Sequence, residues 1–288
     1  MDTNLNISEQ LVPNEDKFSN DFFKRFKLRH NDAPLQLNDD VSKNYVFPTF
    51  YGNASCSIAI FHCDYKAALA MMPSPSMKPV KMTRGRALVI FSCYEYRNVL
   101  NVAPYNEIAM TIPVMTDGGM NVPVLSMLLG DKLEKFGYYV FSMPVTSLEN
   151  RIRGRKIWGL PKNVERLDIT HENSVATTKA SVDGEEPYLE LNIPMNGSAQ
   201  EFDIKSNLYS ILEGQRLTSA TAFKGKFNIT KNMGSLFKKS TTTNSASIKI
   251  GKGPQADMLR ALKIEGEAFQ FRHCDSMNAC FDLAHKKV

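Results

Sequence analysis

The stretch of sequence that decides the fold is residues 154–163, GRKIWGLPKN. It places Lys162 directly after Pro161, in a segment that contains two glycines, Gly154 and Gly159, and apolar residues such as Trp158 and Leu160. Proline fixes its own φ angle, donates no backbone hydrogen bond and pushes the residue before it, here Leu160, toward an extended conformation. The pattern therefore predicts a turn in which one amine is held against apolar side chains.

An amine in a dry pocket can attack a carbonyl group and form a Schiff base, provided that it has lost its proton. An ordinary lysine, with a pKa of about 10.4, is almost fully protonated at pH 7. Removal from water disfavours the ammonium and can lower the pKa by up to about 3–5 units. Trp158 and Leu160 are the candidate apolar wall and substrate contacts beside Lys162. From the spacing alone, a loop lysine with its ammonium in water is the commoner interpretation.

Three segments, taken in order, resemble the acetoacetate decarboxylase family. Residues 154–162 look like the family's active-lysine motif, G-R-E-x-x-G-[YF]-P-K-K. Residues 105–114, YNEIAMTIPV, resemble the strand that carries its active-site glutamate, and residues 64–73, DYKAALAMMP, resemble a short helix after its first strand. The resemblance covers roughly residue 45 to the C-terminus. It implies that Lys162 forms the imine and that Glu107 is the active-site carboxylate. It also implies that no cofactor is needed, since the iminium is itself the electron sink.

Three positions depart from the family pattern. Asn163 stands where the family has a second lysine, so that neighbouring cation is missing and burial or another base would have to lower the pKa of Lys162. Lys156 replaces a glutamate, and Ala54 replaces the first-strand arginine expected to hold the substrate carboxylate. Arg97, on the segment leading to the glutamate, is a candidate substitute for that arginine; its alternative is a surface arginine on a strand.

The resemblance implies decarboxylation of a small-molecule β-keto acid, such as acetoacetate, to a methyl ketone and CO2 by a homo-oligomer. Two alternatives stay open, because the first-strand arginine is absent. One is a Schiff-base aldolase-dehydratase that acts on another oxo acid through Lys162. The other is a non-catalytic barrel that binds a small acid or a protein partner.

The composition of the chain bears on whether the protein binds nucleic acid, a metal ion or a membrane. The chain has 288 residues and a net charge of +5 with both signs interspersed, which is weak evidence for nucleic acid, so no nucleic-acid partner is expected. Its five cysteines match no zinc spacing, which favours free thiols in a reducing compartment and no metal site. No run approaches about 18 apolar residues, and the N-terminus lacks the layout of a signal peptide. We therefore expect a cytoplasmic protein without a membrane partner.

Strand signals dominate after residue 46, as short β-branched or aromatic segments separated by turn residues. They predict a mainly β (α+β) fold: an antiparallel β-barrel-like domain over residues 45–288 with few peripheral helices. The predicted strands are 56–63, 87–94, 107–115, 138–143, 166–170, 176–182, 188–193, 202–205, 226–229, 246–250 and 267–272.

Few helices are predicted, and one lies in a polar N-terminal extension, residues 1–44. There, a helix over 16–28 gathers four phenylalanines, which predicts docking on the barrel or on a neighbouring subunit, with a membrane-surface helix as the lesser alternative. A segment at 117–137, longer than the family norm, could form a lid or a subunit contact. The other predicted helices are 64–72 with Asp64 as N-cap, 125–136, 255–262 and 276–284.

Overall fold

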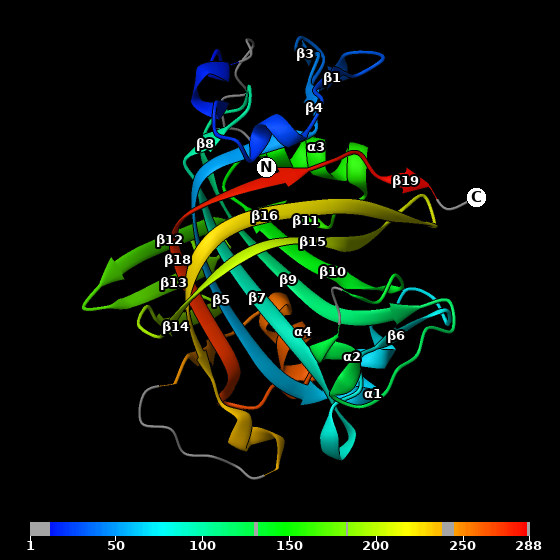
Figure 1. Ribbon diagram of the computed structural model, residues 1–288, viewed down its shortest axis with the longest axis vertical. Helices are drawn as coiled ribbons and strands as arrows, with labels where there is room; N and C mark the ends of the chain where they lie inside the picture. The colour runs from blue at the N-terminus through cyan, green and yellow to red at the C-terminus, as the bar shows by residue number, and fades with distance from the viewer. Residues whose placement is uncertain (1–11, 130–131, 183, 238–244, 287–288) are drawn as a thin grey trace.

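A closed barrel of seven strands forms the centre of the molecule (Figure 1). The computed structural model describes residues 12–129, 132–182, 184–237 and 245–286. β9 pairs with both β7 and β10, which closes the order β10-β15-β16-β18-β5-β7-β9 into a ring. The predicted mainly β fold with few helices is therefore confirmed. The barrel strands are β5 (Thr49–Asp64), β7 (Arg86–Tyr96), β9 (Tyr105–Thr116), β10 (Phe136–Val145), β15 (Ser198–Leu212), β16 (Gln215–Lys231) and β18 (Ala268–Phe281).

The long strand β5 shows why the sequence forms a barrel with two buried faces. Side chains alternate across a strand. Cys56 and Ile58 belong to the apolar cluster inside the barrel, whereas Ala59 and Phe61 belong to a second cluster outside it. Both faces of β5 are covered, so its residues are buried along almost the whole strand, and Asn53 is the exposed exception.

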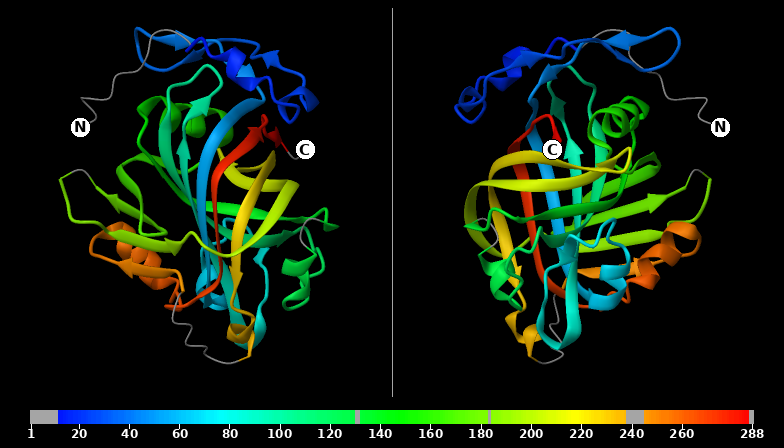
Figure 2. Two further views of the ribbon diagram at one scale, coloured as in Figure 1. Left: turned by 60° about the vertical axis from the view of Figure 1, so that its left-hand side comes forward. Right: turned by 90° about the vertical axis from the view of Figure 1, so that its right-hand side faces the viewer.

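A second, antiparallel sheet covers part of the outside of the barrel. Its Leu189 and Leu191 pack in the same apolar cluster as Phe91 and Ile108 of the barrel. Figure 2 shows this sheet and α4 together on one side of the molecule. The sheet consists of β12 (Arg166–Glu172), β13 (Val175–Ser181), β14 (Leu189–Pro194) and β17 (Ser247–Ile250). The minor strands are β1 (Arg29–His30), β2 (Leu35–Gln36), β3 (Ser42–Lys43), β4 (Val46–Phe47), β6 (Met77–Pro79), β8 (Asn98–Val99), β11 (Lys162–Val164) and β19 (His285–Lys286).

The helices agree with the predictions in part. α1 (Tyr65–Ala70) and α4 (Pro254–Ala261) confirm two of them, and Asp64 caps α1 by accepting a hydrogen bond from the Ala67 amide at 2.8 Å. α2 covers only Leu125–Leu128, and residues 130–131 of the predicted helix 125–136 lie outside the described residues. The predicted helix 276–284 is wrong, because residues 276–281 continue strand β18, with register shifts near Met277 that break its apolar alternation.

A parallel crossover carries the sequence motif. Strand β10 leads into helix α3 (Leu148–Trp158) and then into β11, which pairs parallel to β10 with Met143 opposite Lys162. The predicted turn at 154–158 is wrong: these residues form the end of α3. The helix buries polar side chains, Glu149 and Arg153 among them, so it lacks the apolar periodicity by which helices are recognised. Gly159 ends it in the left-handed conformation, φ 60°, where a side chain would overlap with the Ile211 carbonyl.

The N-terminal segment lies over one end of the barrel (Figure 2). In place of the predicted helix over 16–28 it forms two short 3₁₀ turns, Glu15–Phe18 and Phe23–Arg25. Phe18 and Phe23 are buried against Phe50 of β5, with ring centroids 5.9 and 4.9 Å from it. The first alternative, docking of the phenylalanines on the chain's own barrel, is therefore the one observed.

Two further sequence expectations can be compared with the structure. All five cysteines are free and buried. Among the described residues, no helix is long and apolar enough to cross a membrane.

Candidate active site

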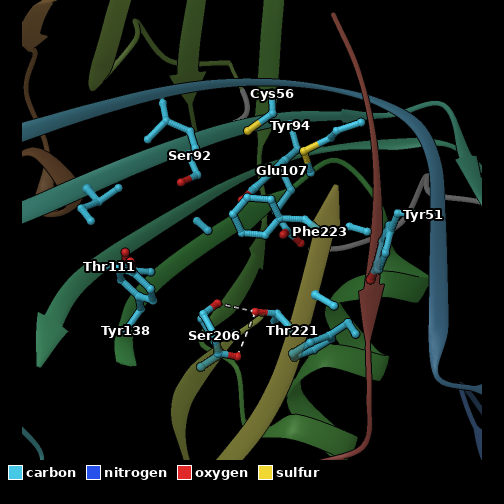
Figure 3. Close-up of a pocket in the computed structure, with 18 of the residues that line it drawn as sticks. Tyr51, Cys56, Ser92, Tyr94, Glu107, Thr111, Tyr138, Ser206, Thr221 and Phe223 are labelled. Carbon is cyan, nitrogen blue, oxygen red and sulfur yellow. Dashed lines mark hydrogen bonds between the residues drawn. The ribbon is translucent and has the colours of Figure 1, made fainter. Parts of the chain in front are cut away.

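A cavity of about 170 Å³ lies inside the barrel. Most of the side chains that line it are apolar, and tyrosine, serine and threonine hydroxyls are interspersed among them (Figure 3). Among the described lining residues, three are charged: Glu107, Lys162 and Arg272. The cavity is thus a largely apolar container with a few convergent charges, which is the usual make-up of a small-molecule site.

Lys162 and Glu107 form a buried ion pair in this cavity. The Lys162 Nζ atom lies 2.6 Å from Oε2 of Glu107, and the two side chains are only 7% and 6% exposed. The pairing of Val145 with Glu107 and of Met143 with Lys162 brings β9 and β11 together on the two sides of β10. The structure therefore brings together the two residues that the sequence resemblance marks as catalytic.

Tyrosine side chains surround the pair. The Tyr96 hydroxyl donates a hydrogen bond to Oε1 of Glu107 at 3.3 Å. The ring of Tyr105 has its centroid 5.6 Å from the Lys162 Nζ atom. Each oxygen of Glu107 thus has one partner, so the carboxylate is held in a fixed orientation toward the amine.

The backbone of the motif fixes the position of Lys162. A Cβ atom on Gly154 would overlap with Cδ of Lys162, so only glycine leaves room for this side chain along α3. Arg155 donates from Nε to the Lys162 carbonyl at 2.6 Å and from Nη2 to Oδ1 of Asn163 at 2.6 Å. The glycine and arginine of the motif are therefore positioning residues for the amine.

Burial lowers the pKa of Lys162 below that of an ordinary lysine. Glu107 opposes this effect, since its negative charge and hydrogen bond favour the ammonium, whereas the positive charge of Arg153 adds to the lowering. The net direction is downward, which raises the fraction of free amine.

Arg153 is the neighbouring cation that the motif was expected to lack. It is almost fully buried, donates to Oγ1 of Thr49 at 3.1 Å, and lies with its guanidinium carbon 4.2 Å from the centroid of the Tyr45 ring. Asn163, by contrast, is exposed, because it follows the inward-facing Lys162 on β11 and points to the other side. A lysine at position 163 would point the same way, so its absence takes no cation out of the cavity.

A second buried ion pair ties the N-terminal segment to α3. The Nζ atom of Lys43 lies 3.1 Å from Oε1 of Glu149, which also accepts a hydrogen bond from the Tyr45 hydroxyl at 2.6 Å. Since Tyr45 packs on Arg153, and Arg153 acts on Lys162, residues before the barrel help to shape the environment of the amine.

The three other predicted site residues lie in different parts of the structure. Leu160 lines the cavity, as predicted. Trp158 does not: it lies behind the wall, stacked on Phe281 at 5.0 Å between ring centroids, and donates from Nε1 to the Asp282 carbonyl. Arg97 lies outside the lining, where its guanidinium donates to the Asp275 carbonyl at 2.9 Å. Arg97 is therefore a surface arginine on a strand, which was the alternative interpretation of this residue from the sequence. It is turned away from the barrel interior and cannot replace the first-strand arginine.

Sequence reasoning missed three residues of the site: Arg153, Tyr96 and Arg272. Arg153 lies in the helix that the sequence pattern concealed, and Tyr96 is a strand tyrosine like many others. Arg272 gave one usable signal, an arginine that follows Phe269 and Phe271 on a predicted strand. A charge among apolar strand residues indicates either an exposed face or a polar contact inside the core.

The histidines of the chain lie outside the cavity lining. His273 is buried between Oγ of Ser57, at 2.8 Å from Nδ1, and Oδ1 of Asp275, at 2.9 Å from Nε2. Ser57 is itself buried, so this serine is not accessible as a nucleophile. In the part of the chain that the structure describes, no group of three or more histidine, cysteine, aspartate or glutamate side chains is arranged to hold a metal ion.

A family model for acetoacetate decarboxylase matches residues 32–275. The chain belongs to the acetoacetate decarboxylase family. The match includes both members of the Lys162–Glu107 pair and confirms the resemblance drawn from the three sequence segments. No curated relative matches the chain in sequence.

Solved structures of the acetoacetate decarboxylase family have the same fold. One acetoacetate decarboxylase is 14% identical, with 83% of this chain and 89% of that chain covered and a TM-score of 0.57. The acetoacetate decarboxylase of Legionella pneumophila is 15% identical, with 84% and 87% covered and a TM-score of 0.57. The enduracididine biosynthesis enzyme MppR in complex with pyruvate is 12% identical, with 83% and 90% covered and a TM-score of 0.56. At these identities the likeness shows the fold alone.

Proposed function

We propose that the protein decarboxylates a β-keto acid through a Schiff base on Lys162. The observation that carries the proposal is the buried Lys162–Glu107 pair, 2.6 Å apart, in a largely apolar cavity. A buried lysine with a lowered pKa is the group that such chemistry requires, because only the neutral amine attacks a carbonyl carbon.

The reaction begins with a proton transfer within the pair. The ammonium of Lys162 gives a proton to Glu107, and the neutral amine attacks the ketone carbon of the substrate. Glu107 passes that proton to the departing hydroxyl group, so that loss of water leaves a cationic imine. The bond between the α-carbon and the carboxylate then breaks, its electron pair moves to the imine nitrogen, and CO2 departs, which leaves an enamine. A proton taken up from solvent through Glu107 reaches the enamine carbon, and water hydrolyses the resulting iminium to release a methyl ketone and the Lys162 ammonium.

The apolar walls support the step in which charge disappears. A carboxylate that becomes CO2 loses its negative charge, and the iminium loses its positive charge at the same moment. An environment of low polarity stabilises the neutral products relative to the separated charges, and it strengthens the interaction between Glu107 and the reacting nitrogen.

A second candidate keeps the imine but retains the carboxylate: aldol addition and dehydration on another oxo acid. Ala54 leaves no arginine at the first-strand position. In addition, a structure of MppR, 11% identical over 83% of this chain with a TM-score of 0.55, contains the condensation product of pyruvate and imidazole 4-carboxaldehyde. These two observations support the alternative without favouring it over decarboxylation.

Borohydride reduction in the presence of acetoacetate and longer β-keto acids tests the imine. We expect a reduced adduct on the peptide that contains Lys162, and no adduct in the Lys162→Met variant. Release of CO2 in parallel supports decarboxylation, whereas formation of a carbon–carbon bond from pyruvate and an aldehyde without CO2 supports the second candidate. Absence of an adduct with any carbonyl compound would contradict both and leave a barrel that only binds small acids.

A further inference from the structure

Arg272 is a cation without a partner in the cavity. Glu107 and Lys162 neutralise one another, so the guanidinium of Arg272 leaves the lining with one uncompensated positive charge. Among the described residues, none forms a hydrogen bond or ion pair with its side chain, and its Nε atom is buried without a hydrogen-bond acceptor. Arg272 is half-buried, and an unpaired cationic donor that is partly removed from water is costly, which points to an anionic ligand.

The strand register places Arg272 inside the barrel. It pairs with Ile58 of β5 and with Ile229 of β16, and both of these belong to the apolar cluster of the barrel interior. The guanidinium carbon lies 5.3 Å from the centroid of the Phe202 ring, which holds the flat group by a cation–π contact. The arginine is therefore packed in place within the cavity wall.

Arg272 and the reactive pair belong to opposite walls. Glu107 is opposite Tyr94, Tyr94 is opposite Cys56, and Cys56 is opposite Cys274 of β18, so three strand steps of the seven-strand ring separate β9 from β18. Figure 3 shows the first three of these side chains close together in the cavity. Arg272 lies two residues before Cys274. Because side chains alternate along a strand, the two residues occupy successive inward-facing positions of β18.

We propose that Arg272 binds a second carboxylate of the substrate, one that takes no part in the reaction. Arg272 lies on β18 and the Lys162–Glu107 pair on β11 and β9, so the arginine is placed away from the carboxylate beside the ketone, the one that leaves as CO2. A guanidinium on the opposite wall holds instead the far end of a longer molecule whose ketone is at Lys162. The inference rests on the proposed function and names its substrate class. That class is a 3-oxo dicarboxylic acid, which has one carboxylate at each end of its carbon chain.

Matched pairs of substrates test this assignment. 3-Oxohexanedioate and 3-oxohexanoate have the same six carbons and differ only in the second carboxylate. The corresponding pairs with seven and eight carbons place the second carboxylate further from the ketone. We expect at least one dicarboxylate to exceed its matched monocarboxylate about 10–100-fold in kcat/KM, the size of one charge-assisted hydrogen-bonded pair. Arg272→Met is expected to reduce the ratio of the two kcat/KM values, dicarboxylate to matched monocarboxylate, to about 1. Arg272→Lys is expected to keep part of the preference.

Arg166→Met provides the matched control, because Arg166 is an exposed arginine paired with Asp168 on the outer sheet. It is expected to leave both substrates unaffected. Equal use of both acids at every chain length, or an equal loss for both in Arg272→Met, would overturn the role of Arg272.

A binding measurement separates this inference from the proposed function. In Lys162→Met no imine forms, and titration calorimetry then compares the affinities for the two acids of each pair. Tighter binding of a dicarboxylate, lost on adding Arg272→Met, supports the carboxylate site even if decarboxylation is never observed. Equal affinities would reject the site even in an active decarboxylase.

Discussion

The side chain of Lys162 lies directly on Gly154, so closely that a Cβ atom at position 154 would overlap with Cδ of the lysine. The motif glycine and Lys162 are thus one structural unit, although eight positions of sequence separate them.

Replacement of Gly154 by alanine is expected to displace the amine while the helix remains. Alanine favours a helix by about 1 kcal/mol relative to glycine, which offsets part of the steric cost. A displacement of about 1 Å from the reacting position lowers turnover by roughly 100-fold. Steady-state kinetics on the folded variant check this, with Lys156→Ala on the exposed side of α3 as the control. Full activity in Gly154→Ala would show that Lys162 adapts without loss.

The reaction is expected to speed up with rising pH through a pKa lower than that of an ordinary lysine. Burial lowers the pKa of Lys162, and only the neutral amine reacts, so activity is lost as the pH falls below that value. Glu107→Gln removes the negative charge that holds the proton and should lower the pKa further. Acetylation of Lys162 measures its pKa in the wild type and in Glu107→Gln. The acetylation rate is followed against pH by peptide mass, with the exposed Lys66 as internal reference. A higher pKa of Lys162 in Glu107→Gln than in the wild type would contradict the assigned role of the carboxylate.

Arg153→Met should change the same pH dependence in the opposite direction. Its positive charge disfavours the ammonium, so its removal should raise the pKa of Lys162 and lower the rate near neutral pH. Arg153→Lys keeps the charge and is the matched control. If both variants had the same pH profile as the wild type, Arg153 would be a packing residue only.

Lys43→Met is expected to destabilise the protein by about 3–5 kcal/mol, because it leaves the Glu149 carboxylate buried without its cation. The double variant Lys43→Met with Glu149→Met should recover much of this loss, since apolar residues can replace a buried pair. Chemical denaturation gives the free energies of unfolding. Lys24→Met removes an exposed ion pair and should leave the unfolding curve unchanged. A similarly small effect for Lys43→Met would mean that water reaches Glu149.

Local signals were enough to predict the strands and to select Lys162 and Glu107, which the structure brings together as an ion pair. β5 and β9 are marked by β-branched and aromatic residues, and the cap of α1 by Asp64, so each could be recognised without knowing its neighbours. Lys162 and Glu107 were recognised through the segments around them, since their spacing of 55 residues carries no geometric information.

The remaining features depend on contacts that a single sequence does not display. Helix α3 buries Glu149 and Arg153 against partners more than a hundred positions away, Lys43 and Thr49, so its pattern resembles a loop. Arg272 becomes part of the site only when the ring closes and β18 lies opposite β9. Arg97 was chosen for its nearness to Glu107 in sequence, but it faces away from the cavity.

The parallel pairing of β11 with β10 has an evolutionary consequence. Lys162 faces the interior only because the crossover through α3 has one particular length, and successive residues of β11 point to opposite sides. Loss or gain of a single residue in that connection would turn the amine to the outside and bring its neighbour in, while every barrel strand could stay as it is. Members of such a family can therefore lose or acquire a reactive amine through a one-residue deletion or insertion, with no substitution at the lysine itself.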